Sequence, residues 1–102
     1  MIGGALEAYN TIAPVIDCYA KMHKLMGPSG AGQKTKMVNQ IAIAGLVQGL
    51  SEAINFAMHA GLNAEDVIEV ISKGAAQSWQ MENRYKTMIA GDFDFGFAVN
   101  CM

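Results

Sequence analysis

The stretch that decides the fold reads Gly27-Pro28-Ser29-Gly30-Ala31-Gly32-Gln33-Lys34-Thr35-Lys36-Met37-Val38-Asn39-Gln40. Pro28 fixes its own φ and biases Gly27 away from the helical region, so a helix begins only after the glycines. Ser29 is the expected N-cap of that helix. The free N–H groups and the dipole of such a helix start favour an anion, a carboxylate or a phosphate. The stretch therefore predicts a tight turn that runs into a helix.

Three polar side chains of this predicted helix share one face. Asn39 and Gln40 follow Lys36 by three and four residues, which places all three side chains on the same side of the helix. Taken alone, each is typical of a solvated helix surface. Together they offer one ammonium and two amides to a small ligand, and a lysine next to a glycine turn can serve in proton transfer.

The helix continues far beyond this face. Residues 31–60 contain no proline, and apolar side chains occupy much of every turn. A helix of that length spans about 45 Å, and one that is apolar around most of its circumference is central to a fold. Gly45 and Gly49 predict a close helix contact inside it, and Gly61 ends it.

The flanking segments are shorter. Apolar residues recur at helical spacing in residues 5–13, and Pro14 is expected to stop or kink that helix and to open a second short one. Residues 21–26 are interpreted as a single strand. After the long helix, Asn63 caps a helix that continues to about Ser72, and another runs from residue 76 or 78 to Met88 and ends near Gly91. Residues 92–97 form an aromatic loop, and residues 98–102 begin one more helix.

Composition limits the possible partners. The 102 residues are 52% hydrophobic and 16% charged, so one domain is expected that buries surface against another domain or a second copy. We therefore expect a homo-oligomer. A formal net charge of −2 gives no electrostatic basis for binding nucleic acid or an anionic membrane.

The most apolar run, residues 41–50, is half of the roughly 20 residues that a membrane span needs, and no signal peptide precedes it. The expected location is the cytoplasm.

Metal and nucleotide motifs do not match. Cys18 and Cys101 follow no metal-ligand spacing and are expected to be reduced thiols, and His23 and His59 have no carboxylate at ligand spacing, so no metal site is predicted. The glycine turn lacks the GxxxxGK[ST] spacing of a phosphate loop. It also lacks the GxGxxG spacing and the strand-helix-strand context of a dinucleotide fingerprint.

As a combination, residues 27–40 resemble the catalytic motif of the β-hydroxyacid dehydrogenases, G-x-x-G-x-G-x-x-x-K-x-x-N followed by N or Q. This family includes 3-hydroxyisobutyrate dehydrogenase, tartronate semialdehyde reductase, glyoxylate and succinic semialdehyde reductases and, more distantly, 6-phosphogluconate dehydrogenase. The likeness continues through residues 1–4, 50–53, 60–63, 78–79 and 88–97. In the 6-phosphogluconate branch, histidine and an acidic residue stand where this chain has Asn39 and Ile43, so the chain is more similar to the short hydroxyacid branch.

The resemblance implies roles for individual residues. Lys36 matches the family's catalytic lysine, the general acid in carbonyl reduction and the general base in alcohol oxidation. Asn39, Gln40 and Gly30 match positions that hold the substrate and its carboxylate. Phe97 matches an aromatic residue close to the nicotinamide. The implied cofactor is NAD or NADP, and the implied substrate is a small hydroxy acid or semialdehyde.

The resemblance also implies the fold: an all-α bundle around one long central helix, similar to the C-terminal domain of 6-phosphogluconate dehydrogenase. Residues 1–26 would be the edge of a missing dinucleotide-binding domain, and residues 27–102 a truncated helical domain for substrate binding and dimerisation. Such a fragment is expected to be inactive alone. The alternative is a helical interaction or oligomerisation module without catalytic function.

Overall fold

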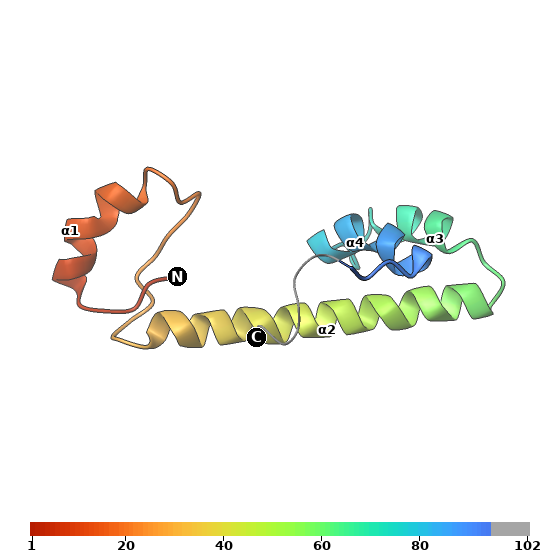
Figure 1. Ribbon diagram of the computed structural model, residues 1–102, viewed down its shortest axis with the longest axis horizontal. Helices are drawn as coiled ribbons and strands as arrows, with labels where there is room; N and C mark the ends of the chain where they lie inside the picture. Colours follow the sequence, from red (N-terminus) through yellow and green to blue (C-terminus); the bar gives the residue numbers. More distant parts are fainter. Residues whose placement is uncertain (95–102) are drawn as a thin grey trace. The chain divides into compact units, whose positions relative to one another are not determined.

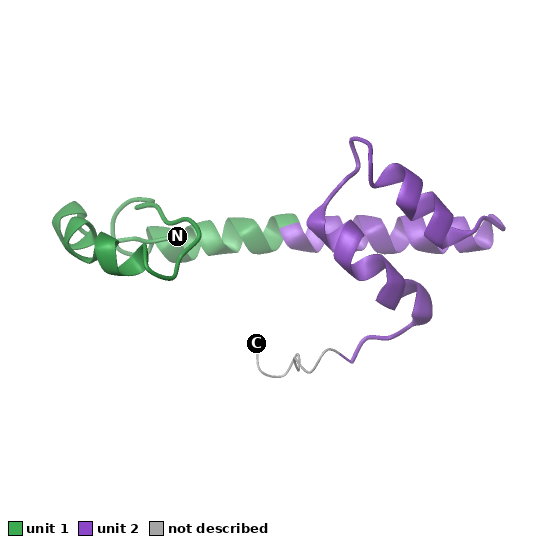
Figure 2. Cartoon of the chain, turned by 90° about the horizontal axis from the view of Figure 1, so that it is seen from above, with its two compact units in different colours: residues 1–42 green, residues 43–102 purple. Residues whose placement is uncertain are grey.

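The computed structural model describes residues 1–94, and its helices follow one another as α1 (Leu6–Ile16), α2 (Ala31–His59), α3 (Ala64–Ile71) and α4 (Trp79–Ala90) (Figure 1). The prediction of an all-α chain with one long central helix is confirmed. Phe97, for which a contact with the nicotinamide was expected, and residues 98–102, for which a helix was expected, lie outside the described residues. The chain divides into two compact units, residues 1–42 and a second unit from residue 43 onward, and α2 contributes to both (Figure 2).

The helix ends follow local sequence signals. Gly61, with φ +74°, closes α2: its N–H donates to the Met58 carbonyl at 3.2 Å, and the Leu62 N–H donates to the Ala57 carbonyl at 3.0 Å. This pair of bonds is the Schellman arrangement, which a left-handed glycine permits without strain. At the other end, Gly30 immediately precedes the helix, so the expectation of Ser29 as N-cap is wrong by one residue.

Side-chain caps start α3 and α4. The Asn63 side chain accepts hydrogen bonds from the backbone N–H groups of Glu65 and Asp66, at 3.0 and 3.4 Å. The Ser78 hydroxyl accepts from the Met81 N–H at 3.1 Å. Each cap satisfies donors that a helix start leaves unpaired, as the sequence predicted for Asn63.

The hydrophobic core lies in the second unit. α2, α3 and α4 all contribute buried side chains to it: Leu50, Ile54, Ala57, Ala64, Ile68, Met81 and Tyr85. Ile68, at 1% exposure, is the most completely buried of them. Burying such a side chain stabilises the fold by about 1.5–3 kcal/mol. The three helices hold this unit together by apolar packing, and in Figure 1 α3 and α4 lie beside the second half of α2.

The predicted close contact at Gly45 and Gly49 is absent from the described residues. A Cβ atom placed on either glycine meets nothing within 4 Å. Both glycines instead line an open groove of about 270 Å³ together with apolar side chains that include Leu46 and Met81. The end of α3 and the start of α4 line the other side of this groove, but they do not come close enough to touch a Cβ at either glycine.

The first unit differs from the prediction in two ways. Pro14 lies inside α1 and does not end it. Only two helical residues follow Pro14. Asn10, whose carbonyl loses a donor, is exposed to solvent, so the cost of the missing bond is reduced.

The predicted strand at residues 21–26 is also wrong. That segment makes one isolated parallel bridge, between Ile2 and Leu25. Two hydrogen bonds flank the bridge: Ile2 N–H donates to the Lys24 carbonyl at 3.1 Å, and Met26 N–H donates to the Ile2 carbonyl at 2.8 Å. α1 lies between the paired segments in sequence, so the order is extended, helix, extended, as in a parallel βαβ crossover. A strand needs further neighbours to extend this pairing, and residues 1–42 supply none.

By length and composition alone, α2 could cross a membrane. Its most apolar 18-residue window has a mean hydropathy of 1.4, and 17% of that window is buried. Residues 41–50 alone are too short to span a membrane, so the sequence predicted no membrane helix. An 18-residue window is long enough, because it adds apolar turns of α2 around Gln48. Length and hydropathy do not distinguish a membrane helix from one that another protein surface covers, so the finding carries no membrane assignment.

Candidate active site at the start of the long helix

The turn before α2 depends on glycine backbone conformations. Gly27 and Gly30 have φ values of +140° and +88°, which residues with side chains rarely adopt. Three hydrogen bonds hold the turn: Gly4 N–H to the Gly27 carbonyl at 2.9 Å, Ala31 N–H to the Pro28 carbonyl at 3.0 Å, and Lys34 N–H to the Gly30 carbonyl at 3.1 Å. The last of these is the first regular α-helical bond, so the start of α2 is well defined.

The predicted site residues lie in the first turns of α2. Lys36 and Gln40 are exposed and Asn39 is half-buried. The Asn39 amide nitrogen Nδ2 donates to the Gln40 oxygen Oε1 at 3.2 Å. This bond leaves the Asn39 oxygen as an acceptor and the Gln40 amide nitrogen as a donor for a ligand. Because Lys36 is exposed, residues 1–42 do not desolvate its ammonium group.

Gly30 and Phe97 complete the set that the resemblance named. Gly30 is half-buried and offers only backbone groups, so any contact that it makes with a ligand is through its N–H or carbonyl. Phe97 lies outside the described residues. The structure thus brings Lys36, Asn39 and Gln40 together on the helix that Gly30 precedes.

A cavity of about 330 Å³ lies in the first unit, and sequence reasoning missed its residues. Its lining includes His23 and Thr35 together with Met1, Met22, Lys24 and Met26. The Thr35 hydroxyl donates to the Ala31 carbonyl at 2.8 Å, so its hydrogen is already used within the helix. Lys36 does not line this cavity, and no spacing in the sequence links residues 22–26 to residue 35.

His23 connects two side chains of the α1 segment. Its Nδ1 lies 3.0 Å from the Tyr9 hydroxyl, and its Nε2 lies 2.8 Å from the Asp17 carboxylate. The Tyr9 and His23 rings also meet edge to face at 5.5 Å. His23 is 11% exposed at its side chain and both ring nitrogens are occupied, so the structure gives this histidine a bracing role between α1 and residues 21–26.

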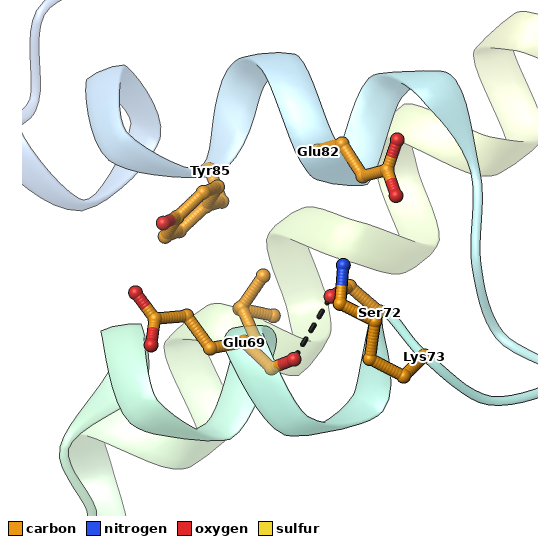
Figure 3. A pocket seen from close by; sticks show the side chains of 6 residues that line it. Glu69, Ser72, Lys73, Glu82 and Tyr85 are labelled. Atoms are coloured by element: carbon orange, nitrogen blue, oxygen red, sulfur yellow. Dashed lines mark hydrogen bonds between the residues drawn. The ribbon is translucent and has the colours of Figure 1, made fainter.

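The second unit contains a separate recess between α3 and α4 of about 610 Å³. Ile68, Glu69, Ser72, Lys73, Glu82 and Tyr85 line it. Figure 3 shows the Glu69 carboxylate and the Tyr85 hydroxyl facing one another across it. The Ser72 hydroxyl donates to the Glu69 carbonyl at 2.9 Å. No residue that the sequence analysis named as a site residue lines this recess.

Comparison with known proteins gives the class of protein. The chain is 63% identical over its whole length to an oxidoreductase from Shewanella frigidimarina and covers 35% of it. It is 38% identical over 98 residues to a probable 3-hydroxyisobutyrate dehydrogenase-like protein from Arabidopsis thaliana, covering 96% of the chain and 29% of the relative. It is 32% identical over 99 residues to 2-hydroxy-3-oxopropionate reductase from Escherichia coli, covering 97% of the chain and 34% of the relative. The relatives are thus oxidoreductases, and the chain spans about a third of their length.

The family follows from a second comparison. Residues 30–102 match the family model described as NAD-binding of NADP-dependent 3-hydroxyisobutyrate dehydrogenase. The match begins at Gly30 and therefore includes Lys36, Asn39 and Gln40. This chain belongs to the 3-hydroxyisobutyrate dehydrogenase family of NAD(P)-dependent hydroxyacid dehydrogenases.

Proposed function

We propose that this chain supplies the proton-transfer lysine and the substrate amides of an NAD(P)-dependent dehydrogenase that interconverts a small hydroxy acid and its semialdehyde. The observation that carries the proposal is the shared face of Lys36, Asn39 and Gln40 directly after the glycine turn. The relatives' names support the substrate class, since they include 3-hydroxyisobutyrate and 2-hydroxy-3-oxopropionate.

In the proposed reaction, the nicotinamide, Lys36 and the two amides each have a separate function. The nicotinamide, when bound, exchanges a hydride with the substrate carbon. In the oxidising direction the uncharged amine of Lys36 takes the hydroxyl proton, and in the reducing direction its ammonium returns a proton to the carbonyl oxygen. The Gln40 amide donates a hydrogen bond to the substrate carboxylate, and Asn39 holds the Gln40 amide in place. Gly30 lies ten residues before Gln40, about 15 Å along the helix axis, so its part in the site is to shape the turn that starts α2.

A lysine accepts a proton only as the uncharged amine, and exclusion of water favours that form over the ammonium. Lys36 is exposed in residues 1–42, so the proposal requires a further protein surface to cover it. The face itself fits the nicotinamide end of the cofactor, because an exposed ammonium and amides leave room for a ring beside them. Nothing in residues 1–94 has the spacing of a cradle for the pyrophosphate. We assign the ring-stacking contact to Phe97.

The chain is proposed to contain parts of two domains. Residues 1–26 are proposed as the edge of a dinucleotide-binding domain and residues 27–102 as the helical domain. The extended-helix-extended order around the bridge between Ile2 and Leu25 supports this division. The 102 residues alone are proposed to be inactive, because the chain spans only about a third of its relatives. The choice between NAD and NADP belongs to the rest of the enzyme. The proposed location is the cytoplasm.

One assay of the full-length enzyme tests the proposal. Reduction of 2-hydroxy-3-oxopropionate and of methylmalonate semialdehyde is followed with NADH and with NADPH, and the 102-residue chain is assayed beside it. Turnover of at least one of these substrates by the full-length enzyme, and none by the short chain, is the expected result. A full-length protein that binds NADH or NADPH and turns over no hydroxy acid or semialdehyde would contradict the proposal and favour a non-catalytic interaction module.

A further inference from the structure

Two glycines of the first unit, Gly3 and Gly32, meet without any side chain between them. A Cβ placed on Gly3 would come within 2.8 Å of the Gly32 nitrogen, 2.8 Å of the Pro28 carbonyl oxygen and 2.9 Å of the Ala31 nitrogen. In the other direction, a Cβ on Gly32 would lie 3.1 Å from both the Gly3 nitrogen and the Met1 carbonyl oxygen. All of these neighbours are backbone atoms, which cannot rotate away as a side chain would.

Gly3 and Gly32 must be glycine because a Cβ would not fit, and not because their backbone φ is unusual. Neither Gly3 nor Gly32 has a φ in the left-handed region, whereas Gly4, Gly27 and Gly30 all do. Gly32 is buried, and it is the residue at which the first turn of α2 touches residues 1–3. Gly45, in the same helix, is the opposite case, since a Cβ there meets nothing within 4 Å.

Residues 1–4 are also held from their other side. Hydrogen bonds join Ile2 to Lys24 at 3.1 Å, Met26 to Ile2 at 2.8 Å, and Gly4 to Gly27 at 2.9 Å. The segment therefore cannot slide away from α2 to admit a methyl group unless some of these bonds break. A methyl group at either glycine must move the first turn of α2 instead.

The surface that Gly32 presents continues toward the proposed catalytic groups. At 3.6 residues per turn, Lys36 lies about 40° around α2 from Gly32, and Asn39 about 20° in the other direction. Lys36 is about 6 Å further along the axis, at 1.5 Å per residue. The face of α2 that packs on residues 1–3 is thus the face from which Lys36 and Asn39 project one and two turns later.

We propose that Gly3 and Gly32 are positioning residues for the dehydrogenase reaction: their backbone-to-backbone contact fixes the first turn of α2 on residues 1–3 and so sets the place of the Lys36 amine. This rests on the proposed function of Lys36. A displacement of about 1 Å at a reacting group can lower a rate by about 100-fold, and a methyl group in this contact requires a displacement of several tenths of an ångström.

The test uses the full-length enzyme with Gly3→Ala, Gly32→Ala and, as a matched control in the same helix, Gly45→Ala. The measurements are kcat, the KM for the semialdehyde, the Kd for NADH, and the kinetic isotope effect with NADH deuterated at the transferred hydride. Gly32→Ala is expected to lower kcat at least 10-fold and to raise the isotope effect, because hydride transfer becomes rate-limiting. The Kd for NADH should change less than threefold, and Gly45→Ala should behave as the wild type.

Other outcomes separate the possibilities. A folded Gly32→Ala enzyme with a lower melting temperature and an unchanged kcat and isotope effect would overturn the proposal, since the contact would then serve stability alone. If Gly32→Ala does not fold, Gly3→Ala, which leaves α2 unaltered, decides by the same criteria. If the proposed function of Lys36 were wrong, a different variant would show it: a Lys36→Ala enzyme would retain turnover.

Discussion

At the scale of single residues, the glycines of this chain fall into two groups with a structural role and one residue without either role. Gly61 adopts a left-handed conformation, with φ +74°, and ends α2. Gly3 and Gly32 leave room for backbone atoms. Gly45 has neither reason to be glycine in the described residues, since it lies in the middle of a helix with open space where a Cβ would stand. Their substitution energies should therefore differ in sign.

A pair of alanine substitutions tests this difference. Gly61→Ala should lower the free energy of unfolding by about 1 kcal/mol, because alanine is strained in the left-handed region. Gly45→Ala should raise it by up to about 1 kcal/mol, because alanine is the better helix former. Urea unfolding followed by circular dichroism measures both. Equal effects of the same sign would show that backbone conformation does not distinguish the two sites.

The cap at Asn63 gives a second prediction for a single residue. Its side chain accepts from the N–H groups of Glu65 and Asp66, so Asn63→Ala should cost about 1 kcal/mol of stability. Asn63→Ser keeps an oxygen in reach and should retain most of the stability. If Ala and Ser were equally destabilising in thermal unfolding, the side-chain cap would have no measurable role.

At the scale of elements, α3 is held to the second unit by one face only. Ile68 is 1% exposed, whereas Val70, two residues later on the other side of the same helix, is 74% exposed. Ile68→Ala should therefore lower the free energy of unfolding by about 2–5 kcal/mol, and Val70→Ala should change it by no more than about 0.5 kcal/mol. Denaturant titration of both variants checks this. A loss at Val70 as large as that at Ile68 would place α3 in a different orientation.

The elements also show what the sequence could predict. The limits of α2 and its closure by Gly61 followed from apolar periodicity and from glycine chemistry, both of which are local. The start of α4 after Ser78 also depends on a local cap. Residues 27–40 likewise carried the candidate site, since the shared face of Lys36, Asn39 and Gln40 is a consequence of helix geometry alone.

The predictions that failed depended on neighbours distant in sequence. The expected end of α1 at Pro14 depended on the surroundings of the proline: only two helical residues follow it, and Asn10, whose carbonyl loses its donor, is exposed to solvent. The strand at residues 21–26 lacked partners beyond Ile2. At Gly45 and Gly49 the neighbouring segments leave a groove, so the close contact expected there is not made. The contact between Gly3 and Gly32, which the sequence did not predict, joins positions 29 residues apart that no spacing rule connects.

At the scale of the whole molecule, apolar side chains of α2 remain without cover in the first unit. Met37, Val38 and Ile41 are 63%, 66% and 74% exposed. Exposed apolar surface of this kind favours association, so we expect the chain to self-associate and the enzyme to be a homo-oligomer.

Sedimentation velocity over a range of concentrations measures that association. The sedimentation coefficient should rise with concentration for the native chain. Replacing Val38 and Ile41 together by lysine, a change of +2 in net charge, should abolish the rise. Replacing Glu65 and Glu69 on α3 together by glutamine, also a change of +2, should not. A native chain that stays monomeric at all concentrations would contradict the expectation.

The proposed reaction of the whole enzyme depends on one amine, that of Lys36, for proton transfer. Lys34 offers a matched control, because it is also exposed, lies two residues earlier in α2, and points about 160° away from Lys36 around the helix. The decisive measurement is the kcat of semialdehyde reduction by full-length Lys36→Ala and Lys34→Ala enzymes, together with the Kd of each for NADH. We predict that Lys36→Ala lowers kcat by about 100-fold or more and leaves the Kd for NADH nearly unchanged, and that Lys34→Ala retains most of its activity. A Lys36→Ala enzyme with near-native kcat, or equal losses in both variants, would contradict the assignment.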